Sequence, residues 1–116
     1  IGEEKISLWL KRNNVLFEEQ KTFDDCFALK KEGKRQNTLL RYDFFIPSEK
    51  LLIEYNGVQH YRPVGIFGGE KRLKEQRHRD WLKRNYAKKN NYKLLTIPYW
   101  DSKIIEEILE KNLFTK

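Results

Sequence analysis

Two acidic residues stand in stretches of this sequence that are otherwise suited to buried strands. Asp43 lies within LLRYDFFIP and Glu54 lies within KLLIEYNG. Both stretches are rich in aliphatic and aromatic residues, which is typical of strands, and the Pro-Ser-Glu sequence at 47–49 is typical of a turn. An acid in apolar surroundings costs folding free energy unless it is paired, so Asp43 and Glu54 are the first candidates for chemistry.

The register of the expected hairpin brings these two acids together. A tight turn at 48–49 makes Asp43 oppose Glu54 on one face, with Cβ atoms about 5 Å apart. Like charges at this distance destabilise a sheet or hold one acid protonated, and a bound divalent cation removes both difficulties. Oxygen ligands of this kind suit Mg²⁺ or Mn²⁺, and the backbone carbonyl of Tyr55 is a further candidate ligand.

The alternative is a surface hairpin whose carboxylates pair with Arg41 and nearby lysines. An apolar set on the other strand face favours a core instead. Phe45 and Leu52 also oppose one another on the face of the acids, so we expect that face to be partly apolar. The set on the other face is Leu40, Tyr42, Phe44, Ile46, Leu51, Ile53 and Tyr55.

His60 follows Glu54 closely in the sequence. If the strand continues past Gly57, its alternation places Asn56 and His60 on the side of the carboxylates. A histidine beside a reacting water can act as a general base, a ligand or a hydrogen-bonding support.

A long helix is expected over residues 70–90, and two faces of it compete for burial. Spacings of three and four residues favour a mixed polar face, whereas Trp81 and Leu82 favour a different side with Asp80 as a surface partner of Arg84. The mixed face consists of Leu73, Gln76, Asp80, Lys83 or Arg84, and Ala87.

The same segment carries most of the positive charge. The formal net charge of the chain is +7, and residues 71–93 hold ten Lys or Arg against two acids, a local net charge of +8. Such a concentrated excess indicates an anionic partner, of which nucleic acid is the commonest inside cells. The residues expected to hold phosphates are Lys71, Lys74, Arg77, Arg79, Lys83 and Arg84.

The remaining pattern predicts one domain over residues 1–116, with a mixed α/β sheet and helices packed on it. Expected helices cover 2–14, 70–90 and 101–112, the last capped by Asp101 or Ser102. Expected strands cover 15–23, 39–47, 50–57 and 93–99, with a further candidate at 26–30 and a polar loop at 30–37. The chain has no apolar run long enough for a membrane span or a signal peptide. Because it begins with isoleucine and contains no methionine, we expect a fragment of a longer protein. Its lone cysteine, Cys26, fits a buried small hydrophobe in a reducing, intracellular compartment.

In their order and spacing, five short segments resemble the PD-(D/E)xK nuclease superfamily, and more narrowly the very-short-patch-repair-like and EDxHD phage homing endonucleases. They are GE at 2–3, YDFFIP around Asp43, IEYNGVQH at 53–60, RDWLK around Asp80 and KLLTIPY at 93–99. The resemblance implies a restriction-endonuclease-like core, a central mixed β-sheet flanked by helices. It also implies that Glu3, Asp43, His60 and Asp80 surround a metal and the scissile phosphate.

The sequence departs from this pattern at Asn56, where the superfamily usually has lysine and these relatives often have aspartate. The choice between Glu3 and Glu4 is open by one residue. Gln59 and Gln76 are further supporting candidates near the expected site.

These observations predict a Mg²⁺- or Mn²⁺-dependent endonuclease that hydrolyses phosphodiester bonds of double-stranded DNA, with Asp43, Glu54 and Tyr55 at the metal. Phosphate contacts carry no sequence choice, so a homodimer or a separate DNA-recognition domain is expected to supply specificity. The expected location is the cytoplasm of a bacterial or phage-infected cell. The alternative is a basic nucleic-acid-binding module without catalysis.

Overall fold

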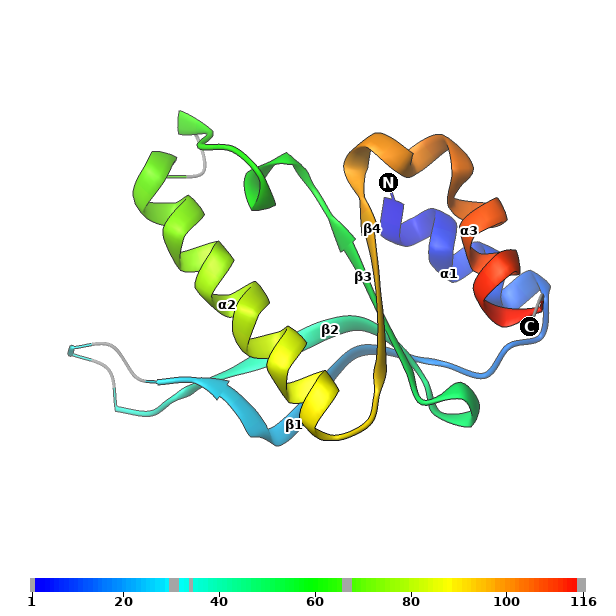
Figure 1. The fold of residues 1–116 in the computed structure, drawn as a ribbon, viewed down its shortest axis with the longest axis horizontal. Helices are drawn as coiled ribbons and strands as arrows, with labels where there is room; N and C mark the ends of the chain where they lie inside the picture. Colours follow the sequence, from blue (N-terminus) through cyan, green and yellow to red (C-terminus); the bar gives the residue numbers. More distant parts are fainter. Residues whose placement is uncertain (1, 30–31, 34, 66–67, 115–116) are drawn as a thin grey trace.

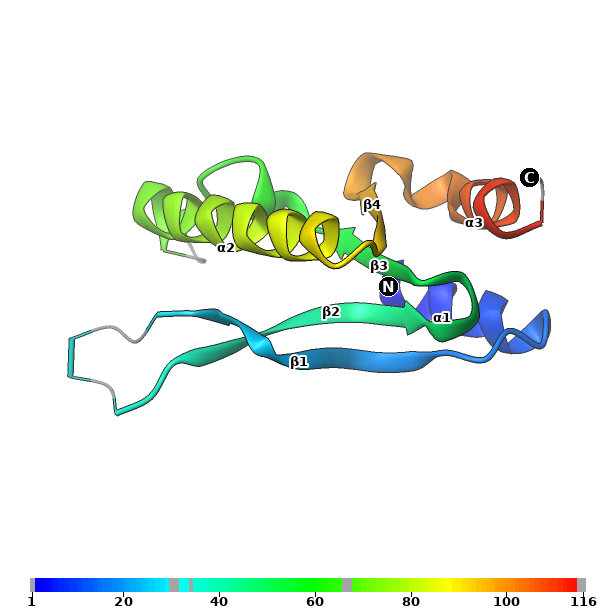
Figure 2. The same ribbon diagram turned by 60° about the horizontal axis from the view of Figure 1, so that its bottom comes forward.

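The structure is a computed structural model that describes residues 2–29, 32–33, 35–65 and 68–114. Within these ranges the strands form a four-stranded mixed sheet in the order β1-β2-β3-β4. Helix α2 covers one face, and α1 and α3 pack together on the other (Figures 1 and 2). The expected mixed α/β architecture is therefore confirmed. The helices are α1 (Gly2–Arg12), α2 (Gly69–Lys89) and α3 (Ile105–Leu113), and the strands are β1 (Glu18–Ala28), β2 (Thr38–Ile46), β3 (Leu51–Asn56) and β4 (Lys93–Pro98).

The central hairpin has the predicted register. Strands β2 and β3 are antiparallel, with Phe44 opposite Ile53 and Ile46 opposite Leu51. A 3-10 turn over Pro47–Glu49 joins them, and Lys50 closes it in the left-handed conformation at φ 49°. Strands β3 and β4 are parallel, so their connection must cross over the sheet, and α2 forms that crossover.

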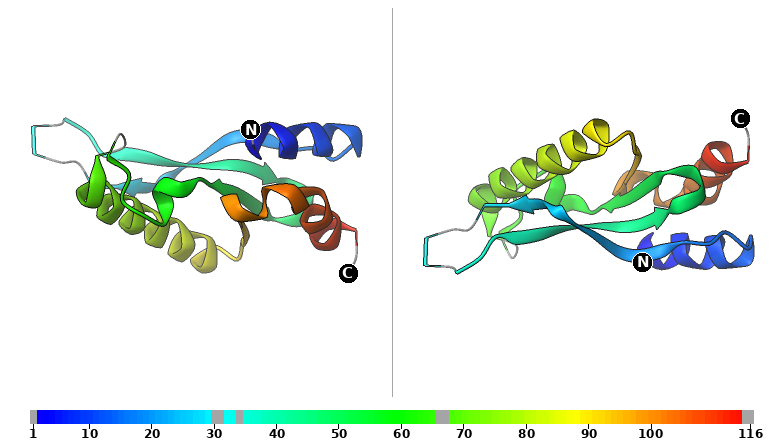
Figure 3. Two further views of the ribbon diagram at one scale, coloured as in Figure 1. Left: turned by 90° about the horizontal axis from the view of Figure 1, so that it is seen from above. Right: turned by 90° about the horizontal axis from the view of Figure 1, so that it is seen from below.

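The core has two layers. Beneath α1 and α3 lie the apolar residues of the β3 centre and the end of β2, including Phe44, Ile46 and Ile53. Beneath α2 lie Leu52, Phe45 and, contrary to the simple alternation, Leu40 and Tyr42. The β1–β2 hairpin twists as it extends beyond β3 underneath α2 (Figures 2 and 3). Its far half can therefore pack on α2, where Leu40 and Tyr42 belong to one cluster with Ala87 of that helix.

Several expected element bounds change in the structure. The two candidate strands before residue 30 form one strand, β1, whose pairing with β2 shifts register between Thr22 and Phe27. The last helix begins at Ile105 without a side-chain cap, because the 3-10 segment η4 (Tyr99–Ile104) takes up Asp101 and Ser102. The predicted cap at Asp101 or Ser102 was therefore wrong. Residues 30, 31 and 34 of the expected polar loop lie outside the described residues.

Cys26 is buried at 2 % exposure and lies against the Tyr42 hydroxyl, as expected for a small core residue. None of the helices in the described ranges combines the length and the apolar character of a membrane span.

Candidate active site

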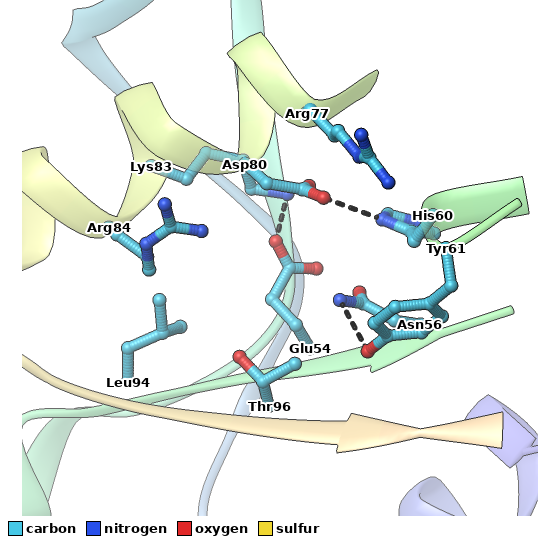
Figure 4. A pocket seen from close by; sticks show the side chains of 10 residues that line it. All are labelled: Glu54, Asn56, His60, Tyr61, Arg77, Asp80, Lys83, Arg84, Leu94 and Thr96. Carbon is cyan, nitrogen blue, oxygen red and sulfur yellow. Dashed lines mark hydrogen bonds and ion pairs between the residues drawn. The ribbon is translucent and has the colours of Figure 1, made fainter. Parts of the chain in front are cut away.

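The candidate site lies over the parallel strands β3 and β4, between the sheet and α2 (Figure 1). A cavity of about 470 Å³ opens there. Figure 4 shows Glu54 at its centre, Arg77 and Arg84 descending from α2, and His60 and Tyr61 at one side. The lining residues are Glu54, Asn56, His60, Tyr61, Arg77, Asp80, Lys83, Arg84, Leu94 and Thr96.

Asp43 occupies the point at which β2 and β3 separate. The last regular pair of this ladder is Phe44 with Ile53, and the Tyr55 backbone N–H donates to Asp43 Oδ2 at 2.7 Å. The side chain thus replaces a strand carbonyl as the acceptor. Burial, together with the nearby charge of Glu54, raises the pKa of Asp43 to about 6. The two acids interact as the register predicted. Asp43, however, is not in a regular backbone pair with Glu54, because its side chain accepts the Tyr55 N–H instead.

Glu54 is 7 % exposed, and its burial raises its pKa while the Lys83 ammonium opposes that rise. Lys83 Nζ contacts Glu54 Oε1 directly (Figure 4). The lysine was predicted on the DNA-binding face, but its side chain is buried. The Tyr42 hydroxyl donates to the Lys83 backbone carbonyl at 2.7 Å, so this part of α2 lies close to the sheet. The sequence hinted at this position only through the helical spacing of Lys83 with Asp80 and Ala87.

Glu3 joins the acids from the start of α1. Gln20 Nε2 donates to Glu3 Oε1 at 3.3 Å, and burial beside Asp43 raises the pKa of Glu3. The preceding residue, Gly2, allows this approach because a Cβ there would overlap the Tyr55 ring. Glu3 and Glu4 are both exposed residues, but Glu3 interacts with Asp43, so the structure places Glu3 rather than Glu4 at the acids.

His60 reaches the cavity by a different route from the predicted one. Strand β3 ends at Asn56, and a 3-10 turn, η2 (Val58–His60), follows because the chain turns back after Gly57, where the His60 N–H donates to the Gly57 carbonyl at 3.1 Å. The expectation that the strand continues was therefore wrong. His60 Nδ1 lies 3.0 Å from Asp80 Oδ2.

Asp80 is held in turn by Gln76, whose Nε2 donates to Asp80 Oδ1 at 3.1 Å. With Asp80 ionised, His60 carries its proton on Nδ1, and the lone pair of Nε2 stays free to accept a proton. Asp80 thus positions His60, and its expected place near a metal stays a prediction.

The two other supporting candidates, Asn56 and Gln59, lie in different hollows. Asn56 is buried at 8 % exposure and donates through Nδ2 to Tyr61 Oη at 3.4 Å. Gln59 instead lines a neighbouring hollow together with Arg62 and Arg72.

The predicted basic residues also divide by face. Arg77 and Arg84 line the cavity, whereas Arg79 lines an apolar hollow on the β1 side of α2. Lys71 and Lys74 are exposed along the helix. Of the two competing helix faces, the mixed polar one is confirmed: it contains the buried residues of α2, while Trp81 is 53 % exposed.

Comparisons with known proteins give relatives without an assigned activity. The chain is 41 % identical over 68 residues to "Uncharacterized protein 307L" of Invertebrate iridescent virus 6, a match covering 58 % of this chain and 34 % of the relative. It is 42 % identical over 76 residues to "Uncharacterized protein 094L" of Frog virus 3 (isolate Goorha), covering 64 % of this chain and 48 % of the relative. The matched region spans about a third and about a half of these two curated relatives. No family model and no solved structure matches the chain.

Proposed function

We propose that this domain is a metal-dependent endonuclease that hydrolyses phosphodiester bonds in DNA. The observation that carries the proposal is the electrostatically coupled pair of acids, Asp43 and Glu54, of which Glu54 is buried and lines a cavity together with Arg77 and Arg84. Acids with raised pKa values in a cleft are typical of functional sites, since burying like charges together costs stability and needs a compensating gain. The restriction-endonuclease-like resemblance remains a prediction that agrees with this arrangement.

The donor set fits a divalent cation of the Mg²⁺ type. Within the described ranges, no three His, Cys, Asp or Glu side chains are arranged as a metal site. Mg²⁺ nevertheless binds through one or two carboxylates and completes its shell with water and substrate phosphate. Asp43, Glu54 and the Tyr55 carbonyl would hold it, and the cation would offset the repulsion from Glu54 that, together with burial, raises the pKa of Asp43. When bound, it would stabilise charge on the phosphate and lower the pKa of the attacking water.

The chain itself supplies the remaining groups. His60 is oriented by Asp80, so its Nε2 can take a proton from water that enters the cavity. Lys83 opposes the rise that burial causes in the pKa of Glu54, and it brings an ammonium to the acids. The resemblance expects a lysine near the acids, two residues beyond Glu54. Arg77 and Arg84 on the cavity wall would bind backbone phosphates.

Phosphate contacts of this kind position double-stranded DNA without selecting a sequence. A homodimer or a separate recognition domain therefore supplies specificity in this proposal. The viral origin of both relatives favours a virus-infected cell as the place of action.

Metal-dependent cleavage of supercoiled plasmid tests the proposal. The parent should cut with Mg²⁺ or Mn²⁺ and not with EDTA, and Asp43→Asn should abolish cutting. Asp24→Asn, which changes an exposed acid on β1, is the matched control and should cut like the parent. The rival function, a binding module without catalysis, predicts that DNA binds equally well with EDTA and that no variant cuts. An Asp43→Asn variant that still cuts like its parent would overturn the proposal.

A further inference from the structure

Three aromatic residues gather beside the cavity without belonging to either core layer. Tyr61 follows η2, while Tyr99 and Trp100 open η4, and both segments lie beyond the ends of the parallel strands (Figure 1). The Tyr61 and Trp100 ring centroids are 4.7 Å apart, and those of Tyr99 and Trp100 are 5.2 Å apart. Trp100 is nevertheless 60 % exposed. A large aromatic ring held by its neighbours and left open to solvent on the rest of its surface is suited to bind a flat partner.

This cluster is continuous with the candidate site. Tyr61 lines the cavity and its hydroxyl accepts from Asn56 (Figure 4). On the other side of the cluster, Arg62 Nη2 donates to Tyr99 Oη at 2.9 Å. Lys5 adds a second cation by donating to the Ser102 carbonyl at 3.3 Å. Aromatic surface next to positive charge matches the chemistry of a nucleic acid strand, which pairs flat bases with phosphates.

We propose that Tyr61, Tyr99 and Trp100 form a stacking platform for an unpaired nucleobase of the strand whose phosphate lies in the cavity. The preferred substrate is then DNA with single-stranded character at the cleavage point, such as a single strand or a single-strand junction. A base inside a duplex already stacks on both neighbours, so it presents only its edges, whereas an unpaired base has a free face for the indole. This inference rests on the proposed function, because it takes the strand bound at the cavity to be DNA.

Binding without cleavage tests the platform. The full chain, in EDTA, is titrated against a fluorescein-labelled single-stranded oligodeoxythymidylate and against a blunt duplex of the same length, with anisotropy as the readout. Trp100→Ala should weaken binding of the single strand by roughly 5- to 150-fold, the range for loss of one base-aromatic stack, and should weaken duplex binding much less. Trp100→Phe should recover most of the lost affinity.

The chain contains a matched control in Trp81, which is 53 % exposed and stacks on His78 of α2 instead. Trp81→Ala should leave both affinities unchanged. Equal effects of Trp100→Ala and Trp81→Ala, equal losses on single strand and duplex, or no loss at all would overturn the platform. If the platform fails in one of these ways but plasmid cleavage still depends on metal and on Asp43, the endonuclease proposal stands. If binding of the single strand depends on Trp100 but neither the parent nor any variant cuts DNA, only the platform is supported.

Discussion

Replacing Asp43 by asparagine should stabilise the protein at neutral pH in the absence of divalent cations. Burial and the charge of Glu54 raise the pKa of Asp43 from its ordinary 3.8 to about 6. A rise of this size corresponds to about 3 kcal/mol of folding free energy, which is an upper limit for the gain from removing the charge. Asparagine keeps an oxygen that can accept the Tyr55 N–H, so the change removes the charge and spares the hydrogen bond.

The stability gained by Asp43→Asn must depend on pH within a defined range. A carboxyl whose pKa is raised by folding binds its proton more tightly in the folded state, so the parent loses stability as the pH rises. The loss begins near pH 3.8 and is complete above about pH 6. The free energies of unfolding of parent and Asp43→Asn should therefore coincide at the acidic end, diverge across this window and run parallel above it.

Urea unfolding in EDTA across this pH range measures the difference directly. In thermal unfolding at neutral pH, the melting temperature of the mutant should exceed that of the parent by about 4 °C for each kcal/mol of stability gained. Adding Mg²⁺ should stabilise the parent by mass action, by about 2.7 kcal/mol at a concentration about one hundred times its Kd, and leave the mutant nearly unchanged. The exposed control Asp24→Asn should follow the parent throughout. A stability difference that does not vary with pH, or a mutant less stable than the parent near neutral pH, would refute the electrostatic coupling.

Three further changes test the way the site is built. Lys83→Met leaves Glu54 buried without its cation, so the free energy of unfolding near neutral pH should fall by about 3–5 kcal/mol in urea titrations. Gly2→Ala pushes α1 away from the Tyr55 ring and displaces the acid that follows it, so plasmid cleavage should fall about 100-fold while DNA affinity is kept. The double change Arg77→Glu and Arg84→Glu should reduce the slope of log affinity against log salt by roughly 2, measured by anisotropy on duplex DNA.

Each of these changes has a control within the chain. Glu54→Gln in the Lys83→Met background should restore most of the stability, and failure to do so would place the loss in packing rather than in the unpaired charge. Gly65→Ala adds a Cβ into open space and should cut DNA like the parent. Lys11→Glu changes an exposed cation on α1, on the opposite layer, and should keep most of the salt slope. A slope unchanged by the arginine reversals would place DNA on another surface.

The sequence alone was sufficient for the strands that carry the acids. Alternation along 44–46 and 51–56, together with the short turn between them, predicted a register that the pairing of Phe44 with Ile53 confirms. The same alternation was wrong for Leu40 and Tyr42, which pack in the layer beneath α2. A slip of one residue would have exposed the core face of both strands, so local pattern and tertiary packing agree here. The positions of α1, α2 and β4 were also predicted within a few residues, since each has a strong period or strong end signals.

The sequence could not predict which side chains meet from separate elements. Lys83 reads as one of many cations on a basic helix, and only the packing of α2 over the sheet decides that its ammonium is buried against Glu54 while Arg77 and Arg84 remain on the cavity wall. His60 was predicted on the right side for the wrong reason, because a 3-10 turn rather than a continued strand delivers it to Asp80.

The aromatic cluster shows the same division most clearly. Tyr61 and Trp100 are 39 positions apart in the numbering and no local period connects them. They meet because β3 and β4 run parallel and end at the same edge of the sheet, so the turns that follow both strands lie side by side. Periodicity in a sequence reports the environment of one element at a time, whereas contacts between elements depend on the crossover, twist and packing that only the folded chain sets.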